Sequence, residues 1–179
     1  MIDAVARLRG LDSCSVSDAC DRLGIEDRVS LASRPLTGPT CIAGRVITVE
    51  LGPVSGGPSR RHLCAAATDA AGPESVIFVA HQGRTDSAGW GGNLSRAAMW
   101  RGSAGTIIDG AARDIDESSE IGYPVFASTA TPRTARGRTE DAAWAGAIEF
   151  DGIAVGHGDY AIADSTGVVF VTADRVEEV

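Results

Sequence analysis

The sequence contains no lysine, because all 16 of its cationic side chains are arginines. Schiff-base enzymes, whether aldolases or pyridoxal phosphate enzymes, need a lysine amine. The Walker A phosphate-binding loop needs its lysine as well. The composition therefore excludes these three classes for this chain. An enzyme of this sequence that stabilises a carbanion would need another electron sink, such as a metal ion.

Metal-binding patterns of cysteine and histidine are also lacking. The chain has four cysteines and three histidines, without a C-x-x-C pair and without histidines at zinc-finger spacing. A zinc site built from these side chains is therefore not expected. We expect the cysteines to be reduced thiols, as in a cytoplasmic protein.

Long apolar runs and an excess of positive charge are absent too. No stretch approaches the length of a membrane span, and the N-terminal residues lack the apolar region of a signal peptide. The net charge of −8 argues against nucleic acid as the main partner. The sequence therefore predicts a cytoplasmic protein that binds neither nucleic acid nor a membrane.

Apolar runs bounded by turn residues predict an alternation of strands and helices. The predicted strands span residues 41–51, 75–80, 105–108 and 124–128, with further short strands from residue 148 onward. The predicted helices span residues 15–23, 60–71, 94–101 and 115–121, and residues 174–179 look like the first turn of another. Ser15 is the expected N-cap of the first helix, and Gly24 is expected just after its end. The pattern predicts a mixed α/β fold with two sheet-like layers and a helical layer.

Two polar segments, residues 81–92 and 109–114, are predicted to be loops that follow neighbouring parallel strands. In open α/β sheets, ligands bind beyond the carboxyl ends of such strands. The first segment ends in Gly89-Trp90-Gly91-Gly92-Asn93-Leu94 and opens a helix. Small residues and free N–H groups at a helix start suit an anion, although an ordinary tight turn has the same composition.

The second segment carries charged side chains that could serve a ligand. Arg113 offers a planar, two-pronged grip on a carboxylate. Asp114 and Glu117 are three residues apart, so a helix that begins there would place both carboxylates on one face. Such a pair suits Mg²⁺ or Mn²⁺, but an acidic helix start exposed to solvent is the alternative. Together the two segments would bind a small 2-oxo acid, with its carboxylate on Arg113 and its keto oxygen on the metal.

One set of motifs runs along almost the whole chain. Its centre is Gly92, followed after twenty residues by Arg113-Asp114-x-x-Glu117. The supporting motifs are Val16-Ser17-Asp18-Ala19, Arg22-Leu23-Gly24, Trp90-Gly91-Gly92, Arg101-Gly102-x-Ala104-Gly105, Asp109-Gly110-x-x-Arg113-Asp114, Tyr123-Pro124-Val125-Phe126-Ala127, Gly158-Asp159 and Ala163-Asp164-x-x-Gly167-Val168. With these motifs the sequence resembles the RraA-like proteins and the 4-hydroxy-4-methyl-2-oxoglutarate aldolases.

The resemblance implies a swivelling β/β/α domain that assembles as trimers or hexamers. We expect a single RraA-like domain over residues 1–179, with C-terminal helices short or absent. The implied activity is that of a class II pyruvate aldolase, which needs Mg²⁺ or Mn²⁺, cleaves 4-hydroxy-2-oxo acids such as 4-hydroxy-4-methyl-2-oxoglutarate and also decarboxylates oxaloacetate.

The resemblance also implies a role for each residue of the motif. Arg113 and Asp114 would be the catalytic pair, with Arg113 on the substrate and Asp114 on the metal. Glu117 would act through metal-bound water. The amides of the loop would hold the pyruvate end of the substrate, and this loop comprises Gly91, Gly92, Asn93 and Leu94.

Two other functions stay open at this level. The chain could be a non-catalytic, oligomeric binding protein of the RraA type, or a relative recruited to specialised metabolism that acts on another 2-oxo acid. A basic cluster, Arg133, Arg136 and Arg138, would bind an acidic substrate or subunit, or would simply form a solvated loop. His81 and His157 are either proton shuttles or structural histidines.

Overall fold

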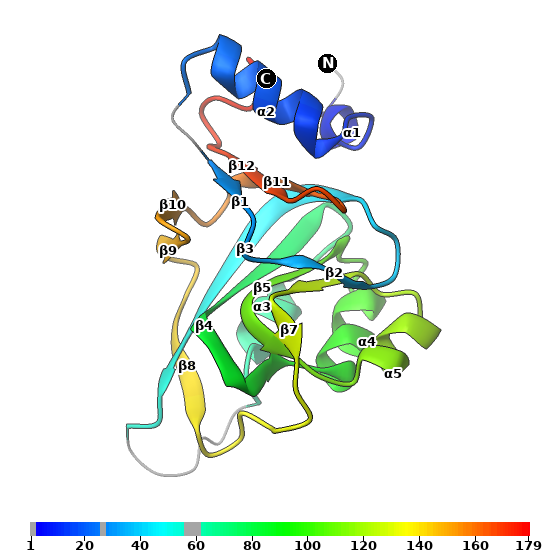
Figure 1. The fold of residues 1–179 in the computed structure, drawn as a ribbon, viewed down its shortest axis with the longest axis vertical. Coiled ribbons are helices and arrows are strands. Elements are labelled where there is room, and N and C mark those ends of the chain that lie inside the picture. The colour runs from blue at the N-terminus through cyan, green and yellow to red at the C-terminus, as the bar shows by residue number, and fades with distance from the viewer. Residues whose placement is uncertain (1–2, 26–27, 56–61) are drawn as a thin grey trace.

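A computed structural model gives the fold of residues 3–25, 28–55 and 62–179 (Figure 1). The helices in these ranges are α1 (Ala4–Leu8), α2 (Ser13–Arg22), α3 (Ala65–Ala70), α4 (Gly92–Trp100) and α5 (Ile115–Glu120). The strands are β1 (Val29–Ser30), β2 (Arg34–Thr37), β3 (Ile42–Pro53), β4 (Ser75–Trp90), β5 (Gly105–Ala112), β6 (Val125–Ala127), β7 (Thr129–Ala130), β8 (Thr139–Trp144), β9 (Ile148–Phe150), β10 (Ile153–Val155), β11 (Tyr160–Ala163) and β12 (Val168–Val171).

One mixed sheet dominates the described part of the chain. Its strand order is β1-β12-β11-β3-β4-β5-β6-β2, with β7 paired to β5 and β8 paired to β3, while β9 and β10 form a separate antiparallel pair. The central strands β3, β4, β5 and β6 pair with one another in parallel. Each step between them runs through a helix, α3, α4 or α5 in turn, as parallel crossovers require. The predicted βαβ unit is therefore confirmed.

Both faces of the central strands are buried, which explains their continuous apolar runs. Along β4, Ile77 and Val79 belong to the core cluster that also contains residues of α3 and α4. Val76 and Phe78 belong to the cluster on the opposite face. Strand alternation thus sends neighbouring residues of one run into two different cores.

The second sheet-like layer arises because the large sheet curls over itself. Strand β12 is separated from β4 by β11 and β3 in the strand order. The ring of Phe170 on β12 nevertheless lies 5.4 Å from that of Phe78 on β4, and the ring of Phe150 on β9 lies 4.9 Å from Phe78. Helices α1 and α2 cover β11 and β12 at the far end of the molecule (Figure 1). The predicted mixed α/β class with a helical layer is confirmed.

The prediction of loops at residues 81–92 and 109–114 is wrong for most of both segments. Strand β4 continues to Trp90 and β5 continues to Ala112. The longer β4 fits beside β5 through register shifts between Ala80 and Arg84, Arg84 and Ala88, and Ala88 and Trp90. Such bulges accommodate extra residues, here polar and glycine-rich ones, within a continuing strand. The apolar periodicity ends at residue 80 although the strand does not.

Other differences concern the ends of elements. Helix α2 begins at Ser13 because the Asp12 side chain, not that of Ser15, caps it by accepting from the Ser15 N–H at 2.7 Å. Gly24 has a φ of +62°, as expected just after this helix. Helix α3 begins at Ala65, while residues 60–61 of the predicted helix lie outside the described residues. Residues 173–178 form turns, in place of the helix predicted to start at residue 174.

The cysteines remain unpaired in the fold. The thiols of Cys20 and Cys64 are buried, and those of Cys14 and Cys41 are exposed. Burial raises the pKa of the Cys64 thiol well above its ordinary value. No helix in the described ranges is long and apolar enough to cross a membrane.

The aromatic cluster between the layers predicts a stability effect. Phe78→Ala removes a fully buried ring that contacts Phe150 and Phe170. The loss should lower the free energy of unfolding by about 3–5 kcal/mol, measured by urea denaturation. The matched control is Leu31→Ala, because the Leu31 side chain is 61% exposed and should contribute little. Equal stabilities of the two variants would contradict the layered packing.

Candidate functional site

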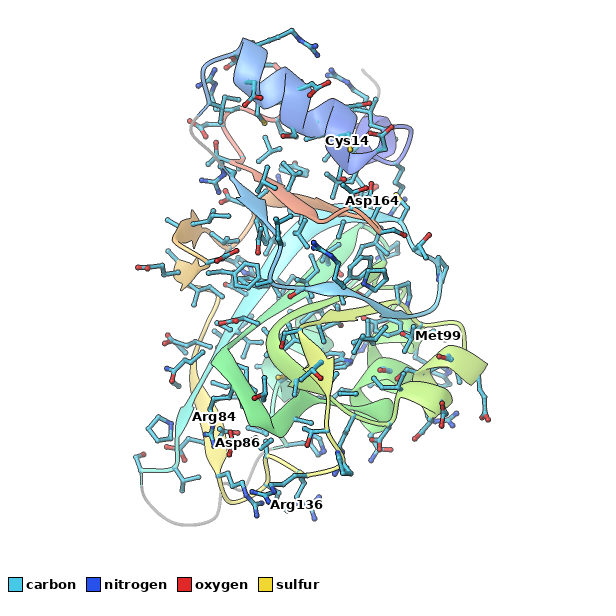
Figure 2. All side chains as sticks on the ribbon, in the orientation of Figure 1. Cys14, Arg84, Asp86, Met99, Arg136 and Asp164 are labelled. Carbon is cyan, nitrogen blue, oxygen red and sulfur yellow. The ribbon has the colours of Figure 1, made fainter. Side chains whose placement is uncertain are left out.

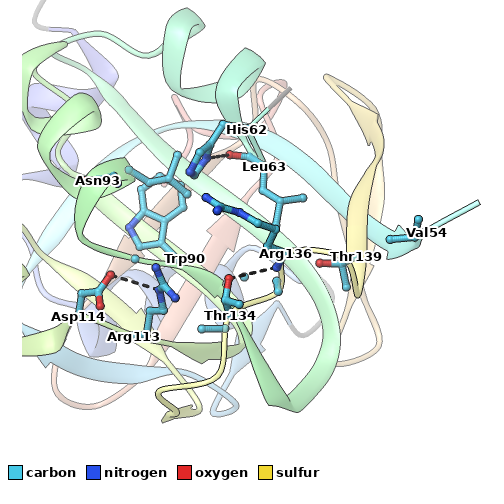
Figure 3. Close-up of a pocket in the computed structure, with 16 residues that line it drawn as sticks. Val54, His62, Leu63, Trp90, Asn93, Arg113, Asp114, Thr134, Arg136 and Thr139 are labelled. Atoms are coloured by element: carbon cyan, nitrogen blue, oxygen red, sulfur yellow. Dashed lines mark hydrogen bonds and ion pairs between the residues drawn. The ribbon is translucent and has the colours of Figure 1, made fainter. Parts of the chain in front are cut away.

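A cavity of about 590 Å³ opens where β4 and β5 end, in the size range of small-molecule sites (Figure 3). It lies between the start of α4, the end of β5 and the segment that leads into β8. Its lining consists of Val54, His62, Leu63, Ala88, Gly89, Trp90, Gly91, Asn93, Leu94, Arg113, Asp114, Thr134, Ala135, Arg136, Gly137 and Thr139. The two segments singled out in the sequence therefore meet in one cavity.

The start of α4 forms one wall of the cavity. Gly91 precedes the first helical residue, so the N–H groups of Gly92, Asn93 and Leu94 have no partner within the helix. The Gly92 N–H donates to Asp114 Oδ2 at 3.0 Å. The N–H groups of Asn93 and Leu94 remain to receive an anion, and both residues line the cavity.

Asp114 is held in a strained conformation at the opposite wall. It precedes the first residue of α5 with φ 56° and ψ 42°, a left-handed conformation that costs a non-glycine residue about 1–2 kcal/mol. Its Oδ2 lies 3.3 Å from Arg113 Nε, and the two side chains are 35% and 37% exposed. The Arg113 backbone is fixed by donation of its N–H to the Trp90 carbonyl at 3.0 Å. The strain turns the carboxylate back toward the start of α4.

Glu117 lies outside the cavity wall. Its Oε1 is paired with Arg96 Nε at 2.7 Å. A Cβ atom added to Gly92 would collide with the Glu117 carboxylate, and one added to Gly91 would lie 2.8 Å from Asp114 Oδ2. The two carboxylates therefore contact successive glycines, but only Asp114 faces the cavity. Asp114 occupies the N-cap position of α5 and is not part of the helix, so its left-handed backbone conformation, and not the helix spacing, places its carboxylate.

The cavity offers few protein ligands for a divalent cation. Among the described residues, no three His, Cys, Asp or Glu side chains form a group that could hold a metal ion. Oδ1 of Asp114 has no hydrogen-bond partner in the described part of the chain, and Asp114 lines the cavity. Mg²⁺ is often bound by one or two carboxylates, with water and substrate oxygens completing its shell. The residues fit that mode and do not fit an all-protein cage.

Buried hydroxyl groups fix the elements that carry the site. Trp90 Nε1 donates to Ser95 Oγ at 3.0 Å, and Ser118 Oγ donates to Ser95 Oγ at 2.9 Å. These three side chains are buried and belong to β4, α4 and α5. The start of α4 and the Asp114 cap of α5 are therefore held in a fixed relation to the end of β4.

Most residues of the third wall of the cavity, formed by the segments before α3 and before β8, were not predicted from the sequence. His62 and Leu63 precede α3, and Thr134, Arg136 and Thr139 lie on the segment that leads into β8. This segment reaches the cavity because β8 pairs antiparallel with β3, a contact between distant parts of the sequence. The basic cluster was the one available signal. Of its members, Arg136 lines the cavity, and Arg133 and Arg138 do not.

His81 and His157 do not line the cavity. The His81 ring is fully buried, and its Nε2–H donates to the Ser87 carbonyl at 2.9 Å. Its Nδ1 has no partner within the described ranges. Burial lowers the pKa of this imidazole, which favours its neutral form. His157 is exposed, and its ring contacts Trp144.

Comparisons with known proteins place these features in context. A family model described as RraA-like, Aldolase/RraA, matches residues 13–170. The protein DlpA of Legionella pneumophila is 29% identical over the whole chain. The 4-hydroxy-4-methyl-2-oxoglutarate aldolase of Thermus thermophilus is 33% identical over 56% of the chain. A crystal structure of a Pseudomonas syringae protein aligns with a TM-score of 0.86 and 31% identity, covering 98% of this chain and 82% of that one.

The match covers less than two thirds of the length of both curated relatives named above. The matched region amounts to 29% of the length of DlpA and 60% of the Thermus aldolase. The match to the family model nevertheless includes the glycines at the start of α4 and the Arg113-Asp114 pair.

The buried His81 predicts a pH-dependent stability. Because its folded pKa is lowered, the unfolded chain binds the proton first, at about pH 6.5. Its contribution is complete above that pH and is lost as the pH falls further, at up to about 1.4 kcal/mol per pH unit. The reference variant is His81→Gln, whose amide can still donate to Ser87. Unfolding free energies of both proteins are measured by urea denaturation from about pH 8 to about pH 5. Over this range the wild type should lose more unfolding free energy than the variant. Parallel curves would contradict this account.

Proposed function

Because the chain belongs to the RraA-like family, we propose that it is a divalent-metal-dependent carbon–carbon lyase that acts on small 2-oxo acids. The proposed substrates are 4-hydroxy-2-oxo acids such as 4-hydroxy-4-methyl-2-oxoglutarate, with oxaloacetate decarboxylation as a second activity. The observation that carries the proposal is the cavity in which Arg113 and Asp114 face the start of α4.

The carboxylate end of the substrate would bind to Arg113. The guanidinium is partly exposed, and only its Nε is near Asp114, so its terminal nitrogens are available to form a fork with a carboxylate. The N–H groups of Asn93 and Leu94 add the favourable end of the α4 dipole. These contacts would orient the 2-oxo group relative to Asp114.

Asp114 would be the protein ligand of Mg²⁺ or Mn²⁺. A divalent cation held there would polarise the keto oxygen of the substrate and stabilise the negative charge that develops during bond cleavage. Asp114 Oδ2 is oriented by the Gly92 N–H and by Arg113, which leaves Oδ1 for the cation. Glu117 would act through water, since its carboxylate lies behind Gly92.

The reaction balances without an added reagent. In 4-hydroxy-4-methyl-2-oxoglutarate the C3–C4 bond breaks, and its electron pair stays on C3. The C4 hydroxyl loses its proton and becomes a carbonyl, and C3 gains a proton. The products are two molecules of pyruvate. From oxaloacetate the same electron flow releases carbon dioxide and one pyruvate.

The proposal includes a cytoplasmic homo-oligomer, a trimer or a hexamer. Two exposed apolar side chains at the end of α4 support an assembly surface, because Met99 is 47% exposed and Trp100 is 96% exposed. Figure 2 places Met99 on the side of the molecule where α4 and α5 lie. Sedimentation experiments test this part of the proposal, and a monomer would reject it.

The decisive experiment is a coupled assay of pyruvate release. The protein is incubated with 4-hydroxy-4-methyl-2-oxoglutarate or oxaloacetate, with Mg²⁺, with Mn²⁺ or with excess EDTA. Pyruvate should appear with either cation and disappear with the chelator. Full activity in EDTA would reject the metal mechanism. Absence of pyruvate from both substrates would favour a non-catalytic binding protein or action on another 2-oxo acid.

Asp114→Asn tests the metal ligand. The amide keeps an oxygen of similar size but loses the negative charge, so activity should fall at least about 100-fold, equivalent to a loss of about 3 kcal/mol of transition-state stabilisation. The control is Asp116→Asn, an exposed carboxylate on α5 that does not line the cavity. Loss of the same size in both variants would show that the effect comes from overall charge and not from the site.

A further inference from the structure

The cavity is larger than its charged end requires. Its volume of about 590 Å³ lies within the range of sites for drug-sized ligands, so a pyruvate unit held at Arg113 and Asp114 fills only part of it. In Figure 3 these two residues lie at one side of the cavity, and Val54 lies at the opposite side. The chemistry of the opposite side therefore decides which larger ligands fit.

The start of β8 brings three cavity residues to this opposite side. Pro53 of β3 is paired with Thr139 of β8, so Val54 follows directly after the pair. The Thr139 N–H donates to the Ala135 carbonyl at 3.0 Å, which holds Ala135 close to the same strand. Val54, Ala135 and Thr139 all line the cavity. Backbone pairing therefore places them together.

Leu63 and Ala88 are held to the same part of the fold. The residue after Leu63 is Cys64, whose N–H donates to the Asp141 carboxylate of β8 at 2.9 Å. The Ala88 N–H donates to the Arg133 carbonyl at 2.9 Å, on the segment that leads into β8. Leu63 and Ala88 also line the cavity. The distal wall, as we name this part of the cavity, comprises Val54, Leu63, Ala88, Ala135 and Thr139.

The distal wall presents hydrocarbon to the cavity. Four of its five side chains consist of carbon and hydrogen alone. The fifth belongs to Thr139, whose hydroxyl oxygen is enclosed and so does not reach a ligand. The Arg136 guanidinium extends away from Thr139, toward Trp90 and His62 (Figure 3). The distal wall therefore offers a ligand an apolar surface.

We infer that the distal wall is an apolar subsite, which binds an uncharged aliphatic substituent on C4 of the substrate. The inference rests on the proposed function, because it places the 2-oxo acid end at Arg113. It extends the substrate class to 4-hydroxy-2-oxo acids with an aliphatic chain, whose cleavage yields pyruvate and an aliphatic aldehyde. Removal of the chain and the wall from water favours binding. The residues of the distal wall determine specificity and take no part in bond cleavage.

A series of non-cleavable ligands tests the subsite. 2-Oxobutanoate, 2-oxopentanoate and 2-oxohexanoate share the 2-oxo acid end and differ only in the number of methylene groups. Their dissociation constants are measured by calorimetry with Mg²⁺ present. Each added methylene should lower the dissociation constant about 4-fold, so the wild type should bind 2-oxohexanoate about 15-fold more tightly than 2-oxobutanoate. This ratio is taken within each protein, so a change in the amount of folded protein does not affect it.

Variants locate the effect on the distal wall. Leu63→Asn replaces an apolar side chain by an amide of similar size and should lower the ratio about 3-fold to 5-fold. Val54→Thr keeps the shape of the side chain, adds a hydroxyl and should lower the ratio about 2-fold to 3-fold. Leu31→Asn is the matched control, because Leu31 is 61% exposed and does not line the cavity. Its ratio should equal that of the wild type.

The outcomes distinguish the two proposals. If all three acids bind through Arg113 with equal affinity, the apolar subsite is rejected and the proposed function stands. The same holds if affinity rises with chain length but neither Leu63→Asn nor Val54→Thr lowers the ratio, or if Leu31→Asn lowers it equally. If no acid binds, or if Arg113→Gln leaves the binding of all three intact, the proposed function is rejected and the subsite with it. A ratio that the two wall variants lower, and Leu31→Asn does not, establishes the subsite.

Discussion

The hydrogen bond from the Gly92 N–H to Asp114 Oδ2 joins the two strand ends on which the site depends. It connects the first residue of α4 to the residue that caps α5, and these helices belong to successive crossovers of the parallel sheet. Asp114 reaches this position only in a left-handed backbone conformation, which the surrounding packing must stabilise. The buried contacts of Trp90, Ser95 and Ser118 supply that support. The carboxylate is thus oriented before any ligand arrives, as a preorganised site requires.

The same constraint explains why small residues stand at the start of α4. Gly91 has an extended backbone, with φ −164°, so its role is to leave space and not to adopt an unusual conformation. A Cβ atom there would meet Asp114 and Arg113, and a Cβ atom on Gly92 would meet Glu117. Close approach of backbone and carboxylates therefore depends on both glycines. The Glu117 carboxylate is paired with Arg96 and does not line the cavity.

The parts of the structure that follow local rules could be predicted from the sequence. Apolar runs located the central strands, and the predicted helices between them in the sequence indicated parallel crossovers. Parallel neighbouring strands place Arg113 and Asp114 beside the start of α4. Spacing alone could not show that Asp114 is a cap, because a residue three positions before Glu117 can stand inside or outside a helix. Thr139 was not predictable, since it reaches the cavity through the antiparallel pairing of β8 with β3. The long β4 was missed because its bulges interrupt the apolar pattern that marks a strand.

The use of arginine as the sole cationic residue type is consistent with the charge distribution around the cavity. The chain as a whole repels anions, yet Arg113 and Arg136 both line this one hollow. Arginine keeps its charge when partly desolvated and presents planar donors in a fixed geometry, so two of them can define both position and orientation of an anion. The negative charge of Asp114 beside Arg113 prevents the proximal end from being purely cationic. An anionic ligand that also carries a polarisable oxygen is therefore favoured over a simple anion, which links the electrostatics of the cavity to 2-oxo acid chemistry.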